Sequence, residues 1–173
     1  MNLTFRITDL LLRTIHTDLS RPHAFAAERV GFLTCGVGAL PGSGLAIYAS
    51  TYHPVIDEDY VDDRGAAAIL GPAAFRRILQ LAYREPTSVF HVHRHDHDGL
   101  PSPSHVDERE SARFIPDFWK VCPNHPHGIL ILSLNSMYGR VWYPHSRAIL
   151  PFTAYKVVGD VPPSLPGRIH ERA

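Results

Sequence analysis

Residues 128–135, with the sequence GILILSLN, form a mostly apolar run that strongly constrains the fold. A run of this length is typical of a central β-strand that is buried on both faces. The segments expected around it follow the order β-α-β-β-α-β-α-β-β-β. This order indicates a single α/β domain, of the α+β type, with a mixed β-sheet flanked by helices.

Alternating and helical spacings of apolar residues give approximate bounds for these elements. A strand is expected over residues 3–7, followed by a helix to about Leu19 that Thr8 or Asp9 caps. Residues 28–38 and 44–55 are expected to pair as a hairpin. The later expected elements are a helix from Pro72 to about Tyr83, a strand over 87–93, a helix from residue 105 that Pro116 ends or disrupts, and strands within 137–144 and 148–158.

The composition fits one soluble domain. The chain has 173 residues, and its 17 Lys plus Arg balance 17 Asp plus Glu, which argues against a dedicated nucleic-acid binder. Cys35 and Cys122 have no CxxC spacing and fit a reducing compartment. No segment approaches the ~20 apolar residues of a membrane span. We therefore expect a cytoplasmic protein, with its domain in residues 1–158 and a mobile Pro-rich tail in 159–173.

The segment FHVHRHDHDGLPSPSHVDERE, residues 90–110, concentrates histidines and carboxylates. Side chains alternate between the two faces of a strand, so His91 and His93 are expected on the same side. Two imidazoles placed in this way can share one ion, and zinc accepts such nitrogen and oxygen ligands. Asp107, at the start of the next helix, is the natural third ligand. The sequence therefore predicts a zinc site formed by His91, His93 and Asp107.

Each of these features also has a simpler interpretation. Ser104 and Asp107 could form an N-terminal cap of the helix, without any role at a metal. An isolated His-x-His in a strand occurs by chance, and Glu28 alone would be a surface carboxylate. His95, Asp96, His97 and Asp98 are expected in a solvated loop, with Asp96 or Asp98 as alternative ligands. The combination of these motifs in this order favours the metal site.

These residues resemble the JAMM/MPN family of zinc metalloproteases, whose pattern is an upstream Glu, a His-x-His strand and a Ser-x-x-Asp helix start. Three parts of this sequence match that pattern in turn: Glu28, the pair His91 and His93, and the pair Ser104 and Asp107. The similarity in element order covers about residues 2–158. It implies a single MPN/JAB-like domain, which has the cytidine-deaminase-like fold. In its compact size and its lack of appended domains, the chain looks more like the bacterial members of this family.

The sequence departs from the family pattern at two points. Arg94 follows the second His, where the family usually has Pro, and the loop from His93 to Ser104 is longer than usual. Metallo-β-lactamase-type hydrolases offer a rival pattern, H-x-H-x-D-H. The HVHRHDH segment is one residue out of register with it, and that fold needs a longer chain.

The resemblance also implies roles. Zinc would activate a water molecule and polarise the scissile carbonyl, Glu28 would act as general base and then acid, and Ser104 would donate a hydrogen bond to the oxyanion. The expected substrate is a ubiquitin-like protein or its conjugates, cut at the C-terminal tail, with activating and conjugating enzymes as partners. Strand addition beside the active site could bind that tail, and the long loop could border the groove. A non-catalytic scaffold, a hydrolase of a small amide or carrier-protein conjugate, and a His-rich binding module are the alternatives.

Overall fold

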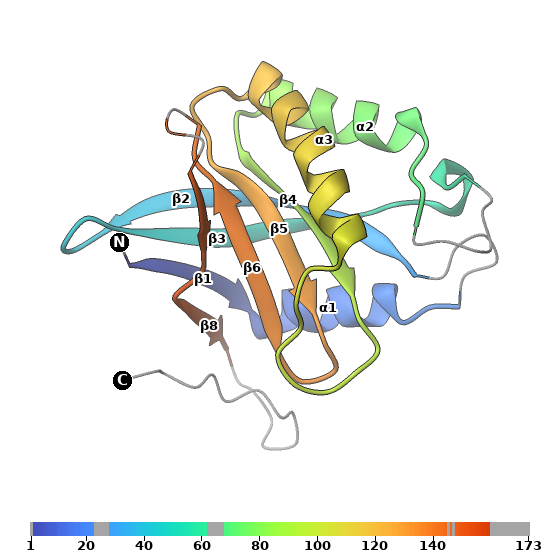
Figure 1. The fold of residues 1–173 in the computed structure, drawn as a ribbon, viewed down its shortest axis with the longest axis horizontal. Helices are drawn as coiled ribbons and strands as arrows, with labels where there is room; N and C mark the ends of the chain where they lie inside the picture. Colours follow the sequence, from blue (N-terminus) through green and yellow to red (C-terminus); the bar gives the residue numbers. More distant parts are fainter. Residues whose placement is uncertain (1, 23–27, 62–67, 145, 147, 160–173) are drawn as a thin grey trace.

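The computed structural model describes residues 2–22, 28–61, 68–144, 146 and 148–159 (Figure 1). These residues form an α+β structure, as expected, with one mixed sheet and three α-helices. The elements are β1 (Leu3–Thr8), α1 (Asp9–Leu19), β2 (Val30–Leu40), β3 (Gly44–Pro54), the 3-10 helix η1 (Asp57–Asp59), α2 (Pro72–Arg84), β4 (Ser88–Arg94), α3 (His105–Val121), β5 (His127–Leu132), β6 (Met137–Trp142), β7 (Ile149–Pro151) and β8 (Ala154–Val158). Of the tail expected over 159–173, residues 160–173 lie outside the described residues.

Most of the expected elements are confirmed, and local chemistry explains their bounds. The Thr8 side chain accepts a hydrogen bond from the Leu11 N–H and caps α1. Pro72 begins α2, where its missing N–H costs nothing. Strands β2 and β3 pair as the expected antiparallel hairpin. No helix among the described residues is long and apolar enough to cross a membrane.

The sheet has the strand order β7-β6-β5-β4-β2-β3-β1-β8, and it curls so that its two ends approach each other (Figure 1). The expectation of a single strand over 148–158 is wrong, because this segment divides into β7 at one edge and β8 at the other. Three residue steps separate Pro151 from Ala154 and span at most ~11 Å. Between them, the Phe152 N–H donates to the Gly139 carbonyl, and the Thr153 N–H donates to the Leu3 carbonyl. This link holds the two ends of the curled sheet close together.

Apolar cores cover both faces of the sheet. One core contains α1 and receives Phe90 and Val92 of β4. The other lies beneath α2 and α3 and receives Val89 of the same strand. Because side chains alternate along a strand, His91 and His93 face the α2–α3 side. Helices α2 and α3 therefore cover the face of the sheet on which the predicted metal ligands lie.

Helix α3 continues to Val121, so the prediction that Pro116 ends or disrupts it is wrong. A proline in a helix interior removes one backbone hydrogen bond and costs ~3 kcal/mol. Pro116 is exposed, so water can hydrate the carbonyl that it leaves without a partner. Phe114, Ile115 and Phe118 are buried on the other side of α3, and each contributes about 1.5–3 kcal/mol. Packing of these three residues outweighs the cost of the proline.

Buried His127 makes folding stability depend on pH. Its Nδ1 accepts a hydrogen bond from the Val89 N–H at 3.0 Å, and its Nε2 donates to the Cys122 carbonyl at 3.2 Å, so the neutral ring is fully used. Burial lowers the pKa of His127 from 6.5 to about 4. The neutral His127 ring therefore stabilises the fold fully above the unfolded pKa of 6.5. This stabilisation is lost as the pH falls from there through the folded pKa of about 4.

We expect this loss to reach roughly 3 kcal/mol between pH 6.5 and 4. Denaturant unfolding at pH 7 and pH 4.5 measures it, with His127→Gln showing a smaller change between the two. His105→Gln is the matched control, because His105 is exposed and should leave the pH dependence unaltered. An identical pH dependence in His127→Gln and the unaltered chain would contradict this assignment.

Candidate metal centre

Three histidines lie in sequence along one side of β4 and its continuation. The backbone of His95 extends the pairing of β4 with β5, because its N–H donates to the Leu132 carbonyl at 2.8 Å. His95 therefore follows His91 and His93 on the same face of the sheet. Ring centroids are 5.5 Å apart from His91 to His93 and 5.1 Å apart from His93 to His95.

Asp107 enters the site from the first turn of α3. Its carboxylate accepts a hydrogen bond from the Ser104 N–H at 2.7 Å, and the Ser104 hydroxyl accepts one from the Asp107 N–H at 3.2 Å. These reciprocal bonds form a capping box that begins the helix and holds the carboxylate in position. The cap and the metal interpretations of Asp107 are therefore compatible, since Oδ1 lies 3.2 Å from Nε2 of His93.

Glu28 reaches the same place from the segment before β2. Val30 pairs with His93 in the antiparallel register of β2 and β4, so Glu28 lies opposite His95 in the continuation of that register. The neighbouring Arg29 is buried and fixes this segment, because its guanidinium bonds to the carbonyls of Arg21 and Pro22 and to Asp57. Glu28 is thus placed by sheet register on one side and by the Arg29 anchor on the other.

Glu28, His93 and His95 each offer a ligand atom, and these atoms all lie within 4.8 Å of one another. Nε2 of His93 lies 3.2 Å from Nε2 of His95, and Nε2 of His95 lies 3.8 Å from Oδ2 of Asp107. These facing nitrogen and oxygen atoms are of the kinds that bind metal ions. A bound cation would satisfy their lone pairs together, so this group can hold a metal ion.

The distances can be compared with a tetrahedral zinc site. Zinc–nitrogen bonds of 2.0–2.1 Å place neighbouring ligand atoms roughly 3.3 Å apart. The separations of His93 from His95 and of His93 from Asp107 are both 3.2 Å, close to that value. The donor set of two imidazoles and a carboxylate is also one that zinc commonly takes. The residues present therefore fit zinc.

The expected ligand His91 is not part of the close group of three among the described residues. Its ring lies against Phe32 and Phe114, with centroids 5.6 and 5.2 Å away. His95, which the sequence placed in a solvated loop, occupies the position expected for the second histidine ligand. Asp96, an alternative ligand in the same loop, is exposed and pairs with Arg94 at 2.6 Å, so it points to a different partner.

Burial and neighbouring charges shift the pKa values in this group in different directions. Burial raises the pKa of Glu28, the proximity of Asp107 adds to this, and His93 opposes it. Burial would also raise the pKa of Asp107, but hydrogen bonds from His93 and Ser104 outweigh it and lower this pKa. Burial, assisted by His93, lowers the pKa of His91 to about 3 and lowers that of His95. The centre therefore combines the neutral imidazoles of His91 and His95, an ionised Asp107 and a Glu28 that binds a proton more readily than usual.

Sequence reasoning missed two residues of the site, His95 and Arg29. Taking His93 and His95 as the His-x-His pair shortens the interval to Asp107 by two residues, and so removes much of the excess loop length. That interval was the available signal for His95. Arg29 carried no signal, because its partners are brought to it only by the folded chain.

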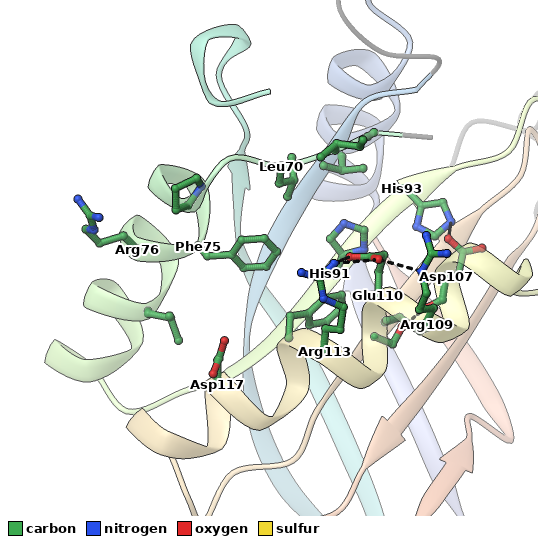
Figure 2. A pocket seen from close by; sticks show the side chains of 18 of the residues that line it. Leu70, Phe75, Arg76, His91, His93, Asp107, Arg109, Glu110, Arg113 and Asp117 are labelled. Carbon is green, nitrogen blue, oxygen red and sulfur yellow. Dashed lines mark hydrogen bonds and ion pairs between the residues drawn. The ribbon is translucent and has the colours of Figure 1, made fainter. Parts of the chain in front are cut away.

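We call Glu28, His93, His95 and Asp107 together the metal group. A cleft of about 1100 Å³ opens beside it, between α2 and α3 (Figure 2). His91 and Phe75 point into it, and His93 and Asp107 lie at one end. Of the residues that the structure describes, none between 94 and 104 lines this cleft, so the long loop does not border it as expected. Instead, the loop is held against the β5–β6 turn, where the Ser133 hydroxyl donates to the Gly99 carbonyl and the Gly99 N–H donates to Asn135.

Comparisons with known proteins give little further information. No family model matches the sequence, and no curated protein matches it. Among solved structures, the Trichoplax adhaerens STIL N-terminal domain is similar, with a TM-score of 0.41 and 15% sequence identity. The similarity covers 81% of this chain and 41% of the solved chain, so the chain spans less than half of that protein's length. This likeness is too weak to assign a family or a function.

Proposed function

We propose that the chain is a zinc-dependent amide hydrolase of the JAMM/MPN type, with an MPN/JAB-like domain. The observation that carries the proposal is the convergence of Glu28, His93 and His95 with Asp107 at the N-terminus of α3. The order of elements around this group, with the glutamate before β2 and the histidines at the end of β4, supports it further. A non-catalytic scaffold would not require these four side chains to face one another.

The proposed ligands are His93, His95 and Asp107. Zinc, when bound, supplies a Lewis acid that lowers the pKa of water and polarises a carbonyl. The ionised Asp107 and the neutral imidazole of His95 are the protonation states that such ligands need. Ser104 supports the arrangement through the capping box, which fixes the Asp107 carboxylate.

Glu28 is the proposed general base and acid. Its raised pKa suits a group that takes a proton from the attacking water and then delivers it to the leaving amine. The Ser104 hydroxyl accepts its bond from the Asp107 N–H, and its own hydrogen remains able to donate. We assign this hydrogen to the oxyanion that develops on the carbonyl of the substrate.

The proposed substrates are ubiquitin-like proteins or their conjugates, cut beside the C-terminal tail, with activating and conjugating enzymes as further partners. β4 is paired with β2 on one side and with β5 on the other, so it has no free edge for strand addition. A tail reaching the metal group would therefore lie in the cleft and be held by side chains. A cytoplasmic location is also proposed, since both cysteines, Cys35 and Cys122, are free and buried.

Incubation of the full chain with ubiquitin-like fusion proteins tests this function. Cleavage at the fusion junction is expected, followed by loss of activity with a metal chelator and recovery on adding zinc. Mass spectrometry of the products identifies the bond that is cut. Cleavage that persists unchanged after metal is removed, or absence of bound zinc in the purified chain, would contradict the proposal.

A further inference from the structure

The rim of the α2–α3 cleft carries an excess of positive charge. Away from the metal group, four arginines and two carboxylates line it: Arg76, Arg84, Arg109, Arg113, Glu110 and Asp117. Figure 2 shows Arg109, Arg113 and Glu110 along α3, with Arg76 on α2. The chain as a whole has no net charge at pH 7, so this excess is a local feature.

The two carboxylates are already occupied by cations of their own helix. Glu110 pairs with Arg109 at 3.2 Å and with Arg113 at 3.1 Å, and Asp117 pairs with Lys120 at 2.7 Å. On the opposite wall, Arg76 and Arg84 are exposed and form no ion pair with any residue that the structure describes. Within the part of the chain that the structure describes, these two guanidinium groups are therefore left for an anionic ligand.

Below this rim the cleft is apolar and aromatic. Phe75 and Leu79 of α2 face Phe114 of α3, and the neutral His91 contributes to the floor next to Phe114. Tyr83 and Val106 extend the apolar surface outwards, with exposed fractions of 74% and 37%. A volume of about 1100 Å³ is large for a small-molecule site and suits a peptide segment.

We propose that this cleft binds a peptide segment that has apolar side chains flanked by carboxylates. Its apolar side chains fill the space between α2 and α3, and its carboxylates pair with Arg76 and Arg84. That the segment adjoins the scissile amide rests on the proposed function, because the cleft ends at His93 and Asp107. Charge complementarity thus favours an acidic recognition segment over a basic one.

Binding of two labelled peptides to the full chain tests this inference by fluorescence anisotropy. Both peptides share the same apolar residues, flanked by Asp and Glu in one and by Lys and Arg in the other. The acidic peptide is expected to bind about tenfold more tightly at low ionic strength, and salt should reduce this preference. Arg76→Gln and Arg84→Gln should each weaken its binding about threefold, and their combination should remove most of the preference.

Lys156→Gln provides the matched control, because Lys156 is an exposed cation on β8, away from the cleft. It should leave both affinities unchanged. Equal or tighter binding of the basic peptide would overturn the inference, as would an unaltered preference in the double variant or equal weakening in Lys156→Gln. Selective binding without any cleavage would refute the proposed function alone, whereas cleavage without charge preference would refute this inference alone.

Discussion

Glu28→Gln is expected to lower the rate of amide hydrolysis by about 10²–10⁴-fold while the chain still binds one zinc ion. The amide of Gln keeps the size of the side chain but cannot accept and return a proton. His93, His95 and Asp107 stay in place in this variant, so zinc content should not change. Parallel measurement of turnover and of metal by elemental analysis separates loss of the base from loss of the site.

The same substitution has an expected effect on stability. Burial raises the folded pKa of Glu28 above its unfolded value, so the stabilising contribution of its protonated form is complete below the unfolded pKa and is lost as the pH rises. At neutral pH, Glu28→Gln in metal-free protein should therefore unfold no more easily than the unaltered chain. In the active chain, the rate should fall once the pH is low enough to protonate Glu28, because the protonated carboxyl cannot accept a proton.

Glu58→Gln is the matched control, because Glu58 is exposed on η1. It should leave turnover, zinc content and stability unaltered. A Glu28→Gln variant that hydrolyses substrate at the normal rate would contradict the proposed role of Glu28. Loss of zinc from Glu28→Gln would instead make this residue a ligand.

His95→Ala is expected to weaken zinc binding by about 100-fold or more, whereas His91→Ala should retain the metal. The reason is positional, since Nε2 of His95 lies 3.2 Å from Nε2 of His93, while the His91 ring packs against Phe114 in the cleft. Elemental analysis after dialysis against a zinc buffer measures the difference. Asp107→Asn should also lose zinc, although asparagine can still cap α3.

His97→Ala controls for the general effect of removing a histidine from this segment, because His97 is exposed. The reverse pattern, with zinc lost from His91→Ala and kept in His95→Ala, would support the ligand pair expected from the sequence. Either result identifies which histidine accompanies His93. The side chain that is not a ligand then remains available for contacts with substrate.

Local patterns in the sequence were enough to predict most of the elements. Apolar periodicity, the Thr8 cap and Pro72 at a helix start act within a few residues, so they can be recognised without the fold. The pairing of Ser104 with Asp107 is equally local, because both hydrogen bonds lie within one helical turn. The mixed α+β class followed from the order of these elements.

Only the tertiary structure determined where those elements meet. The division of 148–158 into β7 and β8 depends on the curl of the whole sheet, and the continuation of α3 through Pro116 depends on the buried side chains around it. The choice between His91 and His95 depends on the register that brings Glu28 beside the end of β4. Contacts between residues far apart in sequence decide these features, and alternation within one strand places both histidines on the same face without distinguishing them.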